Sequence, residues 1–450
     1  MISKKSLIFF LIFALLNGCS FDNKTGIWGG SEKEKRRISE LEKAQKEVIT
    51  TEKIFLSDDL YKKEKKLNKQ INLLKPKKNS FWKTNSLNQQ NFIGNNYLPS
   101  AENIFVKNKV GKNKFSISYI SNSLLSFNDN LLLSDDKGTI FSINSDSGKI
   151  NWKNNVYSKV YKKIYKNLVF SIYKNNLYVA DNIGFIYALN IDSGEIIWSK
   201  NYATPLKSNL KIFKEKIFLL DQNNKIICLS TKDGSIIWNM FTISSFIKSQ
   251  KLLSLAISNE GNLFSLNSSA DLHKIDSSTG DVFWSSNTLD SLNPDATDFF
   301  TSSEIVLTKN EIIFSAGSTF FSYDQNTGSI NWEIKAHSVG APIIVGENIF
   351  FVTDNGYFVI VNKNDGKIIS SNNILKVLKK KKQDTKITGF IMGSGKIYST
   401  TLNGYLIVSS AKSGMVEYAR KVGDPITTSP IIVNGRLYIL TENSKIFGFN

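Results

Sequence analysis

The phrase Gly194-Glu195-Ile196-Ile197-Trp198 recurs along the chain with small changes. Four further copies keep both the glycine and the tryptophan, and they run from Gly148 to Trp152, Gly234 to Trp238, Gly280 to Trp284 and Gly328 to Trp332. Two weaker copies keep only the glycine, from Gly366 to Ser370 and from Gly414 to Tyr418. Successive glycines are 46, 40, 46, 48, 38 and 48 residues apart. Repetition at this period is typical of a β-propeller, in which each repeat is a four-stranded blade.

A predicted β-hairpin precedes each copy of the phrase. It consists of an apolar strand, a polar turn and an alternating strand. Turns such as Asp181-Asn182-Ile183-Gly184 contain the Asn, Asp and Gly residues that supply positive φ angles. We predict eight such hairpins, over residues 131–143, 177–189, 217–229, 263–275, 312–323, 349–361, 397–408 and 437–449.

The count of strands predicts how the ring closes. Only seven glycine phrases follow the eight hairpins, so the last blade would lack an outer strand and expose an edge. Residues 103–110 form a free strand of the right pattern, with Phe105 in the place of the repeat tryptophan. The sequence therefore predicts an all-β, eight-bladed propeller of four-stranded blades, closed by this N-terminal strand in the last blade.

The repeated glycine and tryptophan are interpreted as structural residues and not as a cofactor cage. A wide aromatic ring on the outer strand can cover a turn of the neighbouring blade and fill the gap between two twisted sheets. Burial of such a ring is worth roughly a few kcal/mol. The repeat therefore predicts packing between blades.

The positive charge of the chain is carried mainly by lysine. The formal net charge is +18, and arginine occurs only at Arg36, Arg37, Arg420 and Arg436. Proteins that read nucleic acids favour arginine forks, so no nucleic-acid partner is expected, and an anionic membrane or an acidic partner fits better. Of the two cysteines, Cys228 lies in an alternating strand and is expected to be a small buried hydrophobe.

Residues 1–18 are predicted to form a lipoprotein signal peptide. Two lysines precede an apolar run over residues 7–16 that is short for a membrane-spanning helix. The run ends in Leu16-Asn17-Gly18-Cys19, which resembles a bacterial lipobox. Cys19 is therefore the predicted lipidation site, which would anchor the chain to a membrane. Because Ser20 and not Asp follows the cysteine, the resemblance also implies sorting to the outer membrane.

The remaining chain is divided into two parts. Residues 19–80 are predicted to be a lipid-anchored, charged linker, with helical spacing of apolar residues over 32–48 and a second potential helix over 61–74. Residues 81–450 are predicted to be the propeller.

The order of hairpin, Asp-x-Gly or x-Thr-Gly turn, and x-x-x-Trp resembles the repeat of the PQQ-type (quinoprotein-like) β-propellers. With the lipobox and the C-terminal stretch over residues 427–438, the chain is similar to the BamB type, the propeller lipoproteins of the outer-membrane β-barrel assembly machinery. This resemblance implies a non-catalytic scaffold that is anchored in the outer membrane and faces the periplasm. It also implies binding to the periplasmic domains of the barrel-forming subunit, and help in the insertion of β-barrel proteins.

The resemblance places the partner contacts on two loops of one rim. After the third tryptophan strand, Phe246, Ile247 and Lys248 match one contact loop, with Ile247-Lys248 in the place of a Leu-Arg pair. Before the fifth hairpin, Asp295 and Asp298 match an Asp cluster. Lysine in place of arginine would weaken a bidentate contact with a carboxylate. In the alternative interpretation, Phe246 and Ile247 start a strand and the aspartates cap a turn.

Two other functions stay open at this point. A PQQ-dependent dehydrogenase needs a Ca²⁺ site, an aspartate base and commonly adjacent cysteines, but the chain has neither adjacent cysteines nor a Cys-x-x-Cys-His haem motif. His273 and His337 are expected to be solvated and not ligands. The sequence therefore predicts no enzyme, no bound PQQ and no metal site. The other alternative is a periplasmic lipoprotein that binds peptide or cell wall, which the basic linker would suit.

Overall fold

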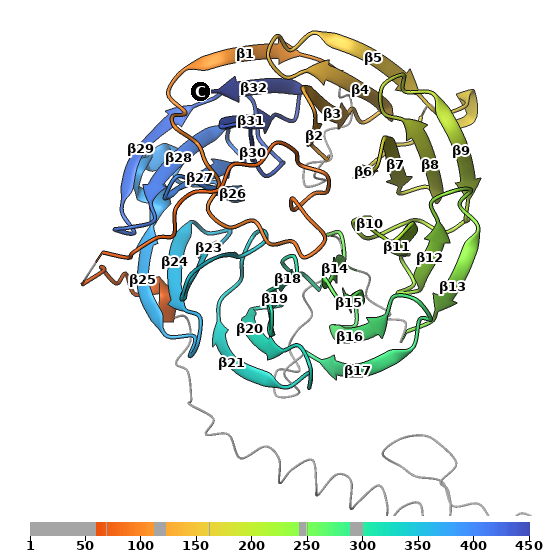
Figure 1. The fold of residues 1–450 in the computed structure, drawn as a ribbon. Coiled ribbons are helices and arrows are strands. Elements are labelled where there is room, and N and C mark those ends of the chain that lie inside the picture. The colour runs from red at the N-terminus through yellow and green to blue at the C-terminus, as the bar shows by residue number, and fades with distance from the viewer. Residues whose placement is uncertain are drawn as a thin grey trace, which may run out of the picture. The chain divides into compact units, whose positions relative to one another are not determined.

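The computed structural model describes residues 60–68, 70–111, 123–161, 163–242, 249, 251–288 and 300–450. In this part of the chain, eight antiparallel sheets of four strands each are arranged around a ring (Figure 1). The prediction of an all-β, eight-bladed propeller with four-stranded blades is confirmed.

Blades 1 to 4 follow one another in the chain, and each runs from its innermost strand to its outermost strand. Their strands are β2 (Leu125–Phe127), β3 (Asn130–Ser134), β4 (Thr139–Asn144) and β5 (Ile150–Asn155); β6 (Leu168–Tyr173), β7 (Asn176–Asp181), β8 (Phe185–Asn190) and β9 (Ile196–Asn201); β10 (Lys211–Phe213), β11 (Lys216–Leu220), β12 (Ile226–Ser230) and β13 (Ile236–Met240); and β14 (Ser254–Ile257), β15 (Asn262–Leu266), β16 (Asp271–Asp276) and β17 (Val282–Asn287).

Blades 5 to 7 repeat this order. Their strands are β18 (Val306–Leu307), β19 (Glu311–Ala316), β20 (Thr319–Asp324) and β21 (Ile330–Lys335); β22 (Ile343–Val345), β23 (Asn348–Val352), β24 (Tyr357–Asn362) and β25 (Ile368–Asn373); and β26 (Ile387–Gly393), β27 (Lys396–Thr401), β28 (Tyr405–Ser410) and β29 (Val416–Lys421). Four short 3₁₀ helices occur in the described connections, η2 (Leu60–Lys62), η3 (Lys159–Tyr161), η4 (Ile374–Val377) and η5 (Lys380–Lys382).

Blade 8 combines strands from distant parts of the sequence. Its order is β1-β32-β31-β30, with β30 (Ile431–Val433), β31 (Arg436–Leu440), β32 (Lys445–Phe449) and β1 (Ile104–Lys109). β1 pairs antiparallel with β32, and just beyond this pair Asn103 and Asn450 exchange two backbone hydrogen bonds of 3.0 Å. The outermost strand of blade 8 therefore precedes blade 1 in the chain, which is the arrangement that the strand count predicts.

The register of β1 differs by one residue from the prediction. A bulge between Ile104 and Val106 puts Val106 opposite Gly448, as the bulge in blade 1 puts Trp152 opposite Ser142. Val106, and not Phe105, therefore occupies the place of the repeat tryptophan. It is only 2% exposed, and a Cβ atom on Gly148 of blade 1 would lie 2.9 Å from its side chain. Since successive side chains of a strand point to opposite faces, Phe105 instead packs against Tyr438, with ring centroids 6.0 Å apart.

The two middle strands of each blade form the apolar core. Neighbouring blades cover both of their faces, so their residues are almost continuously buried, as in β3 and β4. Cys228 on β12 is fully buried, which confirms the prediction of a small buried hydrophobe. The turns between these strands are held by side chains: Asp181 Oδ1 accepts backbone hydrogen bonds from Ile183, Gly184 and Phe185 at 2.8–2.9 Å.

Each tryptophan of the repeat packs against the glycine of the next blade. A Cβ atom on Gly194 would lie 2.5 Å from the indole of Trp152, and the φ angle of Gly194 is +74°, so both space and backbone require glycine there. The indole N–H of Trp152 donates to the carbonyl oxygen of Ile191 at 3.0 Å. The same pair of contacts joins Trp198 to Gly234 and Thr231, Trp238 to Gly280 and Ser277, Trp284 to Gly328 and Gln325, and Trp332 to Gly366 and Lys363.

At the junction between blades 6 and 7 the N-terminal segment replaces the missing tryptophan. Ser370 stands in the tryptophan position, and its hydroxyl donates to the carbonyl oxygen of Lys65 at 3.0 Å. Lys65 and Ser371 exchange backbone hydrogen bonds of 2.9 Å, so the segment pairs with the outer edge of β25. Leu67 lies 3.6 Å from the position of a Cβ atom on Gly414, the glycine that follows in blade 7.

Described residues that precede residue 81 also pack against the propeller. Tyr61 is 8% exposed and packs edge-to-face on Tyr357 of blade 6, with ring centroids 5.4 Å apart. Among the described residues of the range 61–74, where a helix is predicted, only those of η2 are helical. None of the helices in the described residues is long and apolar enough to cross a membrane.

Candidate functional site

The residues predicted to bind a partner or a lipid lie outside the described residues. Phe246, Ile247 and Lys248 belong to the connection between β13 and β14, and Asp295 and Asp298 belong to the connection between β17 and β18. Cys19 also lies outside the described part of the chain. Both predicted loops lead from the outer strand of one blade to the inner strand of the next.

The described residues instead show a site at the ring centre, where residues 77–97 cross one end of the propeller (Figure 1). The innermost strand of each blade is a sheet edge, whose backbone groups need partners. Residues 77–97 supply partners around most of the ring. Backbone hydrogen bonds of 2.7–3.2 Å join Asn79 to Asn434, Trp82 to Ser126, Lys83 to Ile172, Gln89 to Ile257, Gln90 to Leu307, and Asn96 to Met392.

Asn91 and Lys211 anchor this segment to blades 3, 4 and 5. The amide group of Asn91, which is fully buried, donates to the carbonyl oxygens of Leu255 and Ile305 at 2.9 and 2.7 Å. Lys211, at the start of β10, is 1% exposed, and its ammonium donates to Asn91 Oδ1 at 2.5 Å and to the carbonyl oxygen of Asn88 at 3.0 Å. Burial lowers the pKa of Lys211 to about 8, and the nearby Glu304 opposes this shift.

Glu304 joins a second chain of polar groups to the same segment. Its carboxylate accepts from Asn209 Nδ2 at 2.5 Å and from the Ser254 hydroxyl at 3.0 Å. Asn209 Oδ1 in turn accepts from Asn85 Nδ2 at 2.5 Å, and Asn85 Oδ1 accepts from Ser123. Burial raises the pKa of Glu304 although Lys211 and these donors lower it. Buried polar groups stabilise a fold only when they are satisfied, so this network fixes the place of residues 77–97.

The sequence marks part of this site only by its composition. The Asn/Gln-rich stretch between Trp82 and Tyr97 stands out in composition, but nothing in its residue types indicates that it crosses the ring. Lys211 and Glu304 have no sequence signal, because each lies just before or inside a short inner strand that looks like the others. The ring brings these two residues of blades 3 and 5 close enough for their charges to act on each other.

The two histidines differ from the prediction that they are solvated. His273 on β16 is 9% exposed, and burial lowers its pKa. His337, in the connection before β22, is partly buried, with Nδ1 2.8 Å from the carbonyl oxygen of Gly317, and burial lowers its pKa to about 4. Within the residues that the structure describes, no three His, Cys, Asp or Glu side chains are grouped to hold a metal ion.

A model of the family described as "Outer membrane protein assembly factor BamB" matches residues 137–372, just over half of the chain. The matched residues begin in the hairpin turn of blade 1 and end in the outer strand of blade 6. A comparison with curated proteins found no match.

Solved structures share the fold at low identity. BamB from Moraxella catarrhalis superposes with a TM-score of 0.62 at 13% identity, covering 77% of this chain and 100% of that chain. The computationally designed Ika8 protein gives 0.58 at 10% identity, with 76% and 98% covered. Quinohemoprotein alcohol dehydrogenase from Comamonas testosteroni gives 0.61 at 12% identity, with 82% and 80% covered. At these identities the likeness shows the propeller fold alone.

The dehydrogenase neighbour raises the question of whether a quinone cofactor fits the described residues. A ligand on the ring axis at this end would have to displace residues 77–97, whose backbone is bonded to the inner strands. Asn91, Lys211 and Glu304 already have partners inside the chain. The two cysteines are at positions 19 and 228, so no adjacent pair can stack on a quinone. At this end of the ring the described residues do not fit this cofactor.

Proposed function

Because the chain belongs to the family described as outer membrane protein assembly factor BamB, we propose that it is a non-catalytic scaffold for the assembly of β-barrel proteins in an outer membrane. The observation that carries this proposal is the family match over residues 137–372, which spans the tryptophan repeats of blades 1 to 5 and the outer strand of blade 6. A shared fold alone would not support this proposal, because propellers of this shape serve unrelated functions.

The proposal includes an anchor and a location. Cys19 carries the lipid, and the chain is held on the periplasmic face of the outer membrane by it. Replacing Cys19 with alanine is expected to move the chain from the membrane fraction to the soluble fraction and to abolish labelling by radioactive palmitate. Labelling that persists in this variant would contradict the proposed anchor.

The proposed partner is the barrel-forming subunit of the assembly machinery, bound through its periplasmic domains. Phe246, Ile247 and Lys248, together with Asp295 and Asp298, are the proposed contact residues. An apolar residue next to a cation, as in Ile247-Lys248, suits an interface in which a few side chains carry most of the binding free energy.

Co-purification tests this proposal. The tagged full chain, isolated from detergent-solubilised envelopes, is expected to bring the barrel-forming subunit with it. The double substitution Ile247→Glu, Lys248→Glu should lower that recovery by about tenfold or more. The matched control is Lys163→Glu, Ile164→Glu, which makes the same change of charge on an exposed apolar–lysine pair of another connection between blades. Unchanged recovery in the first variant would refute the interface, and no recovery with the wild-type chain would refute the function.

A further inference from the structure

Two lysine-rich segments from distant parts of the sequence meet beside blade 6. One is residues 60–66, which contain η2 and then run along the outer edge of β25 (Figure 1). The other is residues 374–386, which contain η4 and η5 in the connection from β25 to β26. Together the two segments carry ten lysines, no arginine and only two acidic residues, Glu64 and Asp384. We call these two segments the lysine surface.

One acidic residue joins the two segments. Glu64 accepts a hydrogen bond from the backbone N–H of Asn373 at 3.0 Å and pairs with Lys376 at 2.7 Å. One residue further on, Lys65 and Ser371 exchange backbone hydrogen bonds of 2.9 Å. The lysines on both sides of this junction therefore lie on one continuous surface.

The second segment buries its leucines and exposes its lysines. Leu375 and Leu378 are 5% and 6% exposed, and a Cβ atom on Gly356 of blade 6 would clash with Leu375. In η5 the backbone N–H of Lys382 donates to the carbonyl oxygen of Lys379 at 2.7 Å, which closes a turn. The exposed lysines of this segment include Lys376, Lys379, Lys380 and Lys382.

Few acidic groups offset these charges. Glu64 is taken up by Lys376, and Lys386 pairs with Asp354 of blade 6 at 3.2 Å. Asp384 is exposed and is the other acidic residue of the two segments. Within the part of the chain that the structure describes, no ion pair engages Lys63, Lys66, Lys379, Lys380 or Lys382. Like charges held this close repel one another, and an anionic partner relieves that repulsion.

We propose that the lysine surface binds the anionic headgroups of a membrane. Lysine is a compact charge on a flexible stem and suits a fluid layer of phosphates, whereas contacts with a single fixed anion favour the arginine fork. Clusters of about four to eight basic residues near a membrane anchor are typical of proteins that bind anionic lipids. Leu60 and Val377, which are 37% and 44% exposed beside these lysines, add apolar contacts of the kind made at a membrane interface.

The choice of a membrane over an acidic protein rests on the proposed lipid anchor. Residues 20–59 join Cys19, which carries the proposed lipid, to the first lysine segment. A lipid on Cys19 therefore keeps this segment near the bilayer at a high effective concentration. Binding there also orients the propeller, because it turns the edge of the ring at blade 6 towards the membrane.

Sedimentation with vesicles tests the proposal on the chain from Ser20 on, which carries no lipid and keeps every described residue. The probes are vesicles of phosphatidylcholine with about 30% phosphatidylglycerol and vesicles of phosphatidylcholine alone. We expect the anionic vesicles to bind about a hundredfold more tightly than the neutral ones. Most of this difference should be lost in about 1 M salt, where charges are screened beyond about 3 Å.

Substitutions in each segment test whether both belong to one surface. The triple change Lys379→Gln, Lys380→Gln, Lys382→Gln should weaken binding to anionic vesicles by more than about thirtyfold, because each lysine near such a surface contributes about fivefold. The double change Lys63→Gln, Lys66→Gln should weaken it by about tenfold or more. None of these side chains has an ion-pair partner among the described residues, so circular dichroism of both variants should match that of the unsubstituted chain.

A matched control removes three exposed lysines from blades 1 and 3, with Lys149→Gln, Lys153→Gln, Lys232→Gln, and should change binding by less than about threefold. Equal binding to both kinds of vesicle, or a loss in the control as large as in the triple variant, would overturn the proposal. Tighter binding of a hexaglutamate peptide than of anionic vesicles would also overturn it and assign the surface to an acidic protein. Palmitate labelling of the full chain tests the anchor separately, so failure of the anchor and failure of this surface are distinguished.

Discussion

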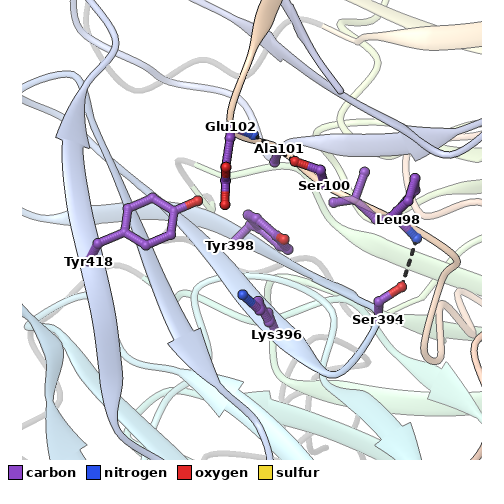
Figure 2. Close-up of a pocket in the computed structure, with 9 residues that line it drawn as sticks. Leu98, Ser100, Ala101, Glu102, Ser394, Lys396, Tyr398 and Tyr418 are labelled. Atoms are coloured by element: carbon purple, nitrogen blue, oxygen red, sulfur yellow. Dashed lines mark hydrogen bonds between the residues drawn. The ribbon is translucent and has the colours of Figure 1, made fainter.

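Five junctions between blades are closed by the same two residues, and the two junctions beside blade 7 are closed differently. From blade 1 to blade 6, a tryptophan packs on the next glycine and donates its N–H to the same turn. Between blades 6 and 7, Ser370 replaces the tryptophan and residues 65–67 occupy the space. Between blades 7 and 8, Tyr418 replaces it and a pocket of about 180 Å³ remains (Figure 2).

This difference shows that the exceptions to the repeat mark where the rest of the chain joins the ring. At Ser370 the segment that precedes the propeller pairs with an outer strand. At Tyr418 the segment that leads into β1 passes over the junction. At these two positions the tryptophan of the repeat is replaced by another residue, and an additional segment of the chain packs there.

The largest loss of stability is expected at the junction between blades 8 and 1, where Val106 occupies the tryptophan position. Val106→Asp buries an unpaired charge against Gly148 and should lower the free energy of unfolding by about 4 kcal/mol. Lys107→Asp, on the exposed face of the same strand, should cost less than about 1 kcal/mol. Denaturant unfolding measures both. If the two variants are equally stable, β1 does not close the ring.

The second largest loss of stability is expected on removal of one indole ring. Trp238→Ala removes the packing on Gly280 and the hydrogen bond to Ser277, and should cost about 3 kcal/mol of unfolding free energy. Trp238→Phe keeps a ring and loses the N–H donor, so it should cost only about 1 kcal/mol. A loss in the alanine variant no larger than that of the phenylalanine variant would show that ring packing is not what joins the blades.

The buried ammonium at the ring centre predicts a pH dependence. The pKa of Lys211 is lowered from 10.5 to about 8 in the folded chain, so between these pH values the unfolded chain binds more protons than the folded one. Stability contributed by Lys211 therefore rises with pH from 8 to 10.5, with a slope of up to about 1.4 kcal/mol per pH unit, and it is lost as pH falls through 8. Lys211→Met should remove this slope. Parallel stability curves for the two proteins over that range would contradict the buried position of Lys211.

The smallest change in stability is expected when a tryptophan is placed at position 370, where the repeat has serine. Ser370→Trp should compete with residues 65–67 for the space above Gly414, and so free that segment from β25 without unfolding the ring. Hydrogen exchange at Lys65 and Ser371 should become faster, with a global stability within about 1 kcal/mol of the wild type. Unchanged protection of both amides would mean that the segment does not depend on the missing ring.

The sequence predicts the blades well because their signals are local. A glycine with positive φ recurs seven times, and at six of these positions an aromatic residue follows four residues later; each of these signals depends on only a few neighbouring residues. The fourth strand of blade 8 could be predicted by counting. Its register could not, because the bulge at Val106 shifts every later side chain to the other face and leaves no trace in the residue types.

The site at the ring centre is beyond sequence reasoning for a different reason. Residues 77–97 have no period, and their backbone partners on the ring lie between 44 and 355 residues away in the chain. In the sequence, nothing distinguishes Asn91 from any other loop asparagine. Only the closed ring places the carbonyl oxygens of blades 4 and 5 next to its amide group. Contacts of this kind follow from the closed ring and not from local propensity.

A double-mutant cycle between Trp152 and Gly194 tests most directly whether the repeat acts through contact between blades. Gly194→Ala puts a Cβ atom at 2.5 Å from the indole and also strains a φ angle of +74°. In a Trp152→Ala background only the backbone strain should remain, so the two substitutions should be non-additive by roughly 1–2 kcal/mol of unfolding free energy. Additivity within about 0.5 kcal/mol would contradict the account.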